Sequence, residues 1–224
     1  MKKYIFSLIL LISFPMFSQQ VRSGYTIITA KQRLDLTRTF ETEEKNIQGS
    51  PYLAETFLPA NVSGYQGVFL LRYNAHKDEM EFQKDEQILY LVKSDSLEVD
   101  FLNSKKKYSY LEYKPGKEII KGFLIVVSNG EKISLFKKEK VNLIPKVEAT
   151  NTYARDSPAR YELQKDTFFI KMDGVIVPFP KNKKELIKMF PDKENPIVDF
   201  IKSNDTSFSK ENDVINLVKF LNSI

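Results

Sequence analysis

The chain has 224 residues, with no cysteine, no tryptophan and a single histidine, which excludes disulfide-stabilised folds, cysteine nucleophiles and zinc sites built from several His or Cys ligands. Its 34 basic residues exceed its 29 acidic residues by only five, and both signs are interspersed, so we expect no nucleic-acid binding. The length suffices for one substantial hydrophobic core or two small ones.

Residues 1–18 have the layout of a secretory signal peptide. A basic n-region, an apolar run too short to span a bilayer and a breaking proline follow one another at Lys2–Lys3, 5–12 and Pro15. We expect cleavage after Ser18 or Gln19, leaving about 205 residues and a net charge of +3 because two lysines are removed. The alternative is an uncleaved N-terminal anchor. We expect the mature protein in the periplasm, free or associated with the outer membrane.

Residues 20–63 form the least regular part of the sequence. Residues 25–30 could be a strand, whereas two prolines within 49–62 argue against a central strand there. We therefore expect an extended arm that docks on the main body. Its docking side chains would be Tyr52, Leu53, Phe57 and Leu58.

Residues 64–180 read as a series of short strands joined by tight turns. The pairs Asn-Gly at 129–130 and Asp-Gly at 173–174 are strong hairpin signals, because both turn residues must tolerate positive φ. Connections too short for a crossover helix require antiparallel pairing. Residues 146–160 look like a longer loop. The expected strands are 67–74, 79–82, 87–92, 107–113, 118–127, 131–138, 167–172 and 175–179.

The hydrophobic period changes to that of helices over 181–224. Asn182 with Glu185 three residues later predicts an N-cap, a second helix is expected to begin at 195–196, and a third at Ser209. The third helix would bury Val214, Leu217, Val218 and Leu221. Because such short helices are marginal alone, we predict one α+β domain: an antiparallel, hairpin-rich sheet, curved or partly closed, covered by two or three C-terminal helices.

The basic runs at 104–108, 136–140 and 181–185 are short and scattered. Runs of this kind are usually solvated turns or guards of edge strands. We therefore expect them to lie at the surface, and we expect contact with a membrane to be peripheral at most.

The candidate chemistry gathers around a predicted hairpin tip at 75–78. His76 stands there beside Asp78, Glu79 and Glu81. One histidine with carboxylates makes at most a partial zinc site, and the alternating carboxylates and glycine of an EF-hand are missing. We expect His76 to be exposed on the tip, with a weak metal or acid contact and catalysis as the alternatives.

Three tyrosines are the other candidates for binding. Tyr108, Tyr110 and Tyr113 lie in one expected strand, where they would pair across strands or stack on sugar rings. A pair of carboxylates suffices for a glycosidase. The sequence contains no glycine-rich phosphate loop, G-x-S-x-G elbow or H-E-x-x-H helix, and we expect no cofactor and no metal.

Several stretches together resemble a family of uncharacterised exported proteins of Bacteroidetes, especially flavobacteria. They are similar in order and spacing over most of the mature chain, and lie at 52–62, 70–82, 122–140 and 181–204. None is a catalytic signature, so the resemblance implies no activity, cofactor or site residue. It implies residence in the periplasm or at the outer membrane and a single β-rich unit.

These observations favour a non-enzymatic binding protein of the cell envelope. Its partner would be an envelope protein or a small apolar or glycan ligand. The alternative is a carboxylate-dependent hydrolase that acts on envelope glycans with Asp78, Glu79 or Glu81. A third hypothesis is a structural subunit of an envelope complex. No feature indicates an oligomeric state.

Overall fold

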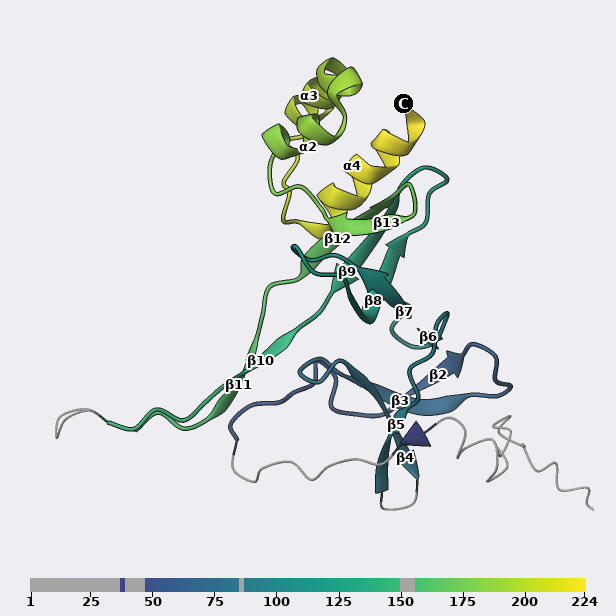
Figure 1. Ribbon diagram of the computed structural model, residues 1–224, viewed down its shortest axis with the longest axis vertical. Helices are drawn as coiled ribbons and strands as arrows, with labels where there is room; N and C mark the ends of the chain where they lie inside the picture. The colour runs from purple at the N-terminus through teal and green to yellow at the C-terminus, as the bar shows by residue number, and fades with distance from the viewer. Residues whose placement is uncertain (1–36, 39–46, 85–86, 150–155) are drawn as a thin grey trace, which may run out of the picture.

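The computed structural model of the protein describes residues 37–38, 47–84, 87–149 and 156–224 (Figure 1). Its mostly antiparallel sheet with helices at the C-terminal end confirms the predicted α+β class. The expected leader at 1–19 and the expected strand at 25–30 lie outside the described residues. No helix among the described residues is long and apolar enough to cross a membrane.

Eleven of the described strands form one large sheet, and two more form a small one. Neighbours in the large sheet follow the order β1-β5-β4-β3-β2-β6-β7-β8-β9-β12-β13, and every pair is antiparallel. The strands are β1 (Thr37–Arg38), β2 (Leu58–Val62), β3 (Phe69–Asn74), β4 (Glu79–Lys84), β5 (Gln87–Leu91), β6 (Glu98–Phe101), β7 (Lys106–Tyr113), β8 (Ile120–Ser128), β9 (Ser134–Lys138), β10 (Val141–Ile144), β11 (Arg160–Leu163), β12 (Thr167–Met172) and β13 (Val175–Pro178).

The two hairpins predicted from turn residues are present. β8 and β9 pair across residues 129–133, and β12 and β13 pair across Asp173 and Gly174. These two residues have φ values of 50° and 82°, as expected for a turn in which both central residues are left-handed.

β2 contradicts the expectation that the prolines of 49–62 exclude a central strand. It contains Pro59 and lies between β3 and β6. The Pro59 carbonyl accepts a hydrogen bond from the amide of Leu102. The proline nitrogen therefore lies at the end of the series of hydrogen bonds between β2 and β6. Proline removes at most one bond at that position, because the paired residues of β6 begin with Phe101 opposite Ala60.

β10 and β11 are two strands that the sequence did not predict, and they flank the loop expected at 146–160. They pair with each other rather than with the large sheet, and a bridge between Val147 and Ser157 extends the hairpin. Its base is tied to the body where Tyr161 donates its amide proton to the carbonyl of Gln48 over 2.8 Å. Figure 1 shows this hairpin projecting from the rest of the molecule.

Three helices and a short 3-10 turn occupy the C-terminal end. They are α2 (Lys183–Met189), η1 (Pro191–Lys193), α3 (Glu194–Ser203) and α4 (Glu211–Ser223). Asn182 caps α2 as predicted, because its side chain accepts the Glu185 amide proton. The predicted start of α3 at 195–196 is wrong, because η1 runs directly into a helix that begins one residue earlier. α4 begins two residues after Ser209.

The strands β9 and β12 separate two parts of the core. Leu135 and Ile170 are paired and face the helices, whereas Phe136 and Phe169 are paired and face the opposite side, which follows from the two-residue period of a strand. Figure 1 shows the helices above this end of the sheet. A third cluster lies under β2 to β8.

The large sheet is partly curled and is not closed, since β1 and β13 are its two ends among the described strands. Lys114, which follows β7, donates its amide proton to the Ile176 carbonyl of β13 over 2.9 Å. The sheet order places three strands between β7 and β13, so this bond requires the sheet to bend back toward itself.

Candidate functional site

The hairpin between β3 and β4 is shaped by the side chain of Asn74. Its amide oxygen accepts the backbone protons of His76 over 3.1 Å and Lys77 over 3.0 Å, which is the geometry of an Asx turn. Asp78 completes the reversal with a φ of 57°. The turn therefore has a fixed conformation, and it places His76 and Asp78 in set positions.

His76 is half-buried, which corrects the expectation of an exposed tip. Its Nδ1 lies 3.2 Å from the Val141 carbonyl oxygen, and its ring meets the ring of Tyr161 edge to face at 5.3 Å. The amide of Val141 in turn donates to the carbonyl of Ala75. The cause is the β10–β11 hairpin, whose base packs against the turn and covers the ring.

Asp78 lies in a network with a buried lysine. Its Oδ1 accepts hydrogen bonds from Lys138 Nζ over 2.6 Å and from the Tyr73 hydroxyl over 2.7 Å. Lys138 Nζ also donates to the Phe123 carbonyl over 2.9 Å. Burial lowers the pKa of Lys138, while the Asp78 charge opposes that shift. Burial also raises the pKa of Tyr73.

This network favours a structural role for the lysine over a nucleophilic one. An ammonium group has three protons, and Lys138 Nζ lies within hydrogen-bond distance of three oxygens, on Asp78, Tyr73 and Phe123. An amine that attacks a substrate must present a free lone pair. The contacts of Lys138 instead use all three of its ammonium protons.

Gly122 makes room for Asp78 at the start of β8. A Cβ at this position would collide with Asp78 Oδ2 and would lie 3.3 Å from Cε1 of Tyr113. The Asp78 carboxylate and the Tyr113 ring thus both occupy the space that a side chain at position 122 would need. Burial, helped by the Asp78 charge, raises the pKa of the Tyr113 hydroxyl to about 12.

His76, Asp78, Tyr113 and Lys138 line an open groove of about 830 Å³. One wall comes from the β3–β4 turn and from the segment around the start of β8. The other comes from the bases of β10 and β11 and the start of β12. The polar and charged lining residues are His76, Asp78, Tyr113, Lys121, Lys138, Lys140, Asn142, Glu162, Gln164, Lys165 and Thr167.

The charged groups of the groove leave a positive excess. Of its four lysines, Lys138 is paired with Asp78, and Lys121 lies 2.7 Å from the carboxylate of Asp95. Lys140 and Lys165 form no ion pair with any residue that the structure describes. These two ammonium groups give the groove its excess of positive charge.

The other two predicted carboxylates lie away from the groove. Glu79 pairs with Lys93 over 3.0 Å. Glu81 is fully buried and accepts hydrogen bonds from Arg72 Nε over 2.7 Å and Asn74 Nδ2 over 2.8 Å. In the part of the chain that the structure describes, no three His, Cys, Asp or Glu side chains gather as metal ligands would.

The three predicted tyrosines lie in different surroundings along β7. Tyr108 is buried, and its hydroxyl donates to Glu139 over 2.8 Å. Tyr110 packs on Phe123 at a ring distance of 5.2 Å. Of the three, only Tyr113 lines the groove. The structure thus brings His76, Asp78 and Tyr113 together, and places the other four candidate residues elsewhere.

Sequence reasoning missed Lys138, Lys140 and Lys165. The run at 136–140 was expected to be solvated, yet β9 is a central strand, and Lys137 and Glu139 are buried. The partner of Lys138 is distant in sequence, since Asp78 lies 60 residues away. No signal within the run identifies such a partner.

A comparison with known protein families, characterised proteins and solved structures finds no match to this chain.

Proposed function

We propose that this protein is a non-enzymatic binding protein and that its groove takes up an acidic glycan. The observation that carries the proposal is the presence of two lysines without a described carboxylate partner, Lys140 and Lys165, in a groove of about 830 Å³. Charge-assisted hydrogen bonds from such groups to carboxylate or sulfate are stronger than those between neutral partners.

Besides the lysines, several lining residues can form hydrogen bonds with a sugar. Asn142, Gln164 and Thr167 supply amide and hydroxyl groups along one wall, and such groups donate to and accept from sugar hydroxyls. The aromatic residues at the base, Tyr113 and Phe169, are nearly buried. With so little exposed surface, they leave no open face for a sugar ring to stack on.

The expected export signal at 1–19 agrees with this proposal. An exported protein of the periplasm or outer membrane meets acidic glycans in the cell envelope, and its contact with the membrane itself would be peripheral. A sheet curled strongly enough to be partly closed would support the groove. The hydrogen bond between Lys114 and Ile176 would fix the curled end of the sheet.

Titration calorimetry tests the proposal with an acidic and a neutral oligosaccharide of equal length, oligogalacturonate and a cello-oligosaccharide. The wild type is expected to bind only the acidic one. The double variant Lys140→Gln/Lys165→Gln should weaken that binding at least tenfold, ~1.4 kcal/mol, because it removes both unpaired charges. The matched control is Lys202→Gln/Lys219→Gln on the exposed faces of α3 and α4.

Equal affinity of the groove variant and the control would contradict the assignment of the site. Binding of both oligosaccharides alike would contradict the role of charge.

The alternative of a carboxylate-dependent hydrolase now depends on Asp78 and Glu162, the two carboxylates that line the groove. The oligogalacturonate chain length should be unchanged after prolonged incubation with the protein. Shortening that is abolished by Asp78→Asn would favour the hydrolase over the binding protein.

A further inference from the structure

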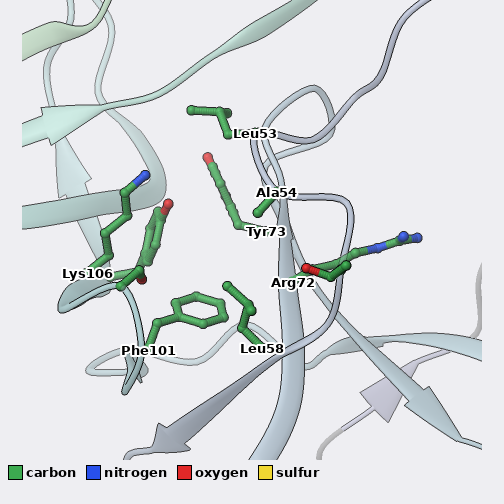
Figure 2. Close-up of a pocket in the computed structure, with 10 residues that line it drawn as sticks. Leu53, Ala54, Leu58, Arg72, Tyr73, Phe101 and Lys106 are labelled. Carbon is green, nitrogen blue, oxygen red and sulfur yellow. The ribbon is translucent and has the colours of Figure 1, made fainter.

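A second pocket, separate from the groove, lies beneath the segment that precedes β2. Figure 2 shows its lining residues, among them Leu53, Leu58, Tyr73 and Phe101. Its other lining residues come from the same segment, from β3 and from the β6–β7 hairpin: Ala54, Thr56, Arg72, Ser104, Lys106 and Tyr108. None of these residues lines the groove.

The floor of this pocket is made of aromatic carbon. The ring of Tyr108 lies 4.8 Å from the ring of Tyr73 and 5.7 Å from the ring of Phe101. Both hydroxyls are engaged elsewhere, that of Tyr73 by Asp78 and that of Tyr108 by Glu139. The floor therefore offers a ligand apolar contact without hydrogen-bonding groups.

The covering segment is held in place, so the pocket is already formed in the free protein. The Arg72 guanidinium lies 3.8 Å from the centre of the Tyr52 ring and 4.6 Å from that of Phe57, and it donates to the Glu55 carbonyl over 3.0 Å. A preformed site avoids the entropic cost of ordering a loop on binding. Leu53, at the edge, remains 40% exposed.

The pocket has a volume of about 60 Å³, several times the ~10–15 Å³ that a single water requires. A space of this size with an apolar lining accepts a few methylene or methyl groups. It is too small for a sugar ring or an aromatic side chain to enter fully. A space of this size and lining fits the end of an alkyl chain.

The cations beside the pocket differ in whether they have a carboxylate partner. Arg72 and Lys106 are each neutralised by a buried carboxylate, Glu81 and Glu139, and Figure 2 shows the Arg72 head pointing away from the pocket. Lys105, in the turn beside Lys106, is exposed and forms no ion pair with a described residue. An anionic head group would find its counter-charge there.

We infer that this pocket binds the alkyl end of a small anionic amphiphile, with the head group near Lys105. Carboxylates and phosphates share this chemistry. The inference is independent of the proposed glycan binding, because the two sites have no lining residue in common.

The test follows amide chemical shifts of the ¹⁵N-labelled protein during titration with hexanoate, hexyl phosphate, 1-hexanol and hexyltrimethylammonium. Hexanoate and hexyl phosphate should perturb residues 53–58 and 101–108, and their relative affinities identify the preferred head group. The neutral and cationic probes should bind at least threefold more weakly. Acetate, which lacks the chain, should cause no saturable shift.

Three variants check the site. Ala54→Trp, at an exposed lining position, should fill the mouth and abolish binding. Leu53→Ala should weaken binding about fivefold through lost apolar contact, whereas Leu70→Ala, at a leucine 51% exposed elsewhere, should leave it unchanged. Lys105→Gln should remove the preference for anions, and Lys117→Gln, in another exposed turn, should not.

The inference would be overturned by hexanol binding as tightly as hexanoate, by shifts centred on the groove residues, or by equal binding of Leu53→Ala and Leu70→Ala. The absence of any saturable shift with hexanoate and hexyl phosphate would also overturn it.

Discussion

Glu81 illustrates how this chain keeps a carboxylate inside its core. Its side chain is fully buried, and its two oxygens receive hydrogen bonds from Arg72, Asn74 and Tyr52. Burying a charge without partners costs several kcal/mol, so each donor helps to offset that penalty. The same reasoning applies to Lys138, which is surrounded by three acceptors.

Replacing Arg72 by alanine should strongly destabilise the fold, because it leaves the Glu81 charge buried without its cation. We expect a loss of about 3 kcal/mol in the free energy of unfolding, measured by urea denaturation. The matched control is Lys107→Ala, which breaks an exposed pair with Glu98 at 2.8 Å and should cost about 0–1 kcal/mol. Equal losses in the two variants would contradict the account of the buried pair.

Buried tyrosines should make the fold sensitive to alkali. Burial raises the pKa of Tyr73, Tyr108 and Tyr113 above the ordinary value of 10.0. Above pH 10 the unfolded chain releases these protons while the folded chain retains them, so stability falls as pH rises. Each retained proton contributes about 1.4 kcal/mol per pH unit. Lys138, whose pKa is lowered by burial, has the opposite effect, which ends at the ordinary lysine pKa of 10.5.

Urea denaturation at pH 9 and pH 11 measures this loss. Tyr113, with a folded pKa of about 12, contributes stability that is lost between pH 10 and 12, so Tyr113→Phe should lose about 1 kcal/mol less than the wild type over this interval. A wild-type stability that does not change from pH 9 to pH 11 would contradict the burial of these hydroxyls.

At the scale of elements, α4 is a short helix that depends on packing against the sheet for its stability. Its stripe of Val214, Leu217, Val218 and Leu221 is buried, as the helical spacing predicted. Leu217→Ala should lower the free energy of unfolding by about 2–5 kcal/mol. The exposed Asn216→Ala should change it by less than about 0.5 kcal/mol. Similar values for both would show that α4 does not pack on β9 and β12.

Elements specified by neighbouring residues could be predicted from the sequence. The Asp-Gly turn at 173–174 and the Asn182 cap depend on residues within four positions. The central position of Pro59 depends on the pairing of β2 with β6, which comes from a distant part of the chain. The groove is of the second kind, since Asp78 and Lys138 are 60 residues apart.

At the scale of the whole molecule, Tyr73 lies between the two proposed sites. Its ring forms part of the apolar pocket, while its hydroxyl contacts Asp78, which lines the groove. The hydroxyl also lies 3.1 Å from Lys138 Nζ. One buried side chain thus supports both sites, although no residue is shared by their linings.

The central claim is that the groove between the β3–β4 turn and the base of the β10–β11 hairpin is the binding surface. Amide shift mapping with oligogalacturonate tests it most directly. The account predicts saturable shifts on both walls, at residues 76–78, 121–122, 138–142 and 162–167, and unchanged amides in α2, α3 and α4. Shifts confined to the helices, or no saturable shift at all, would contradict it.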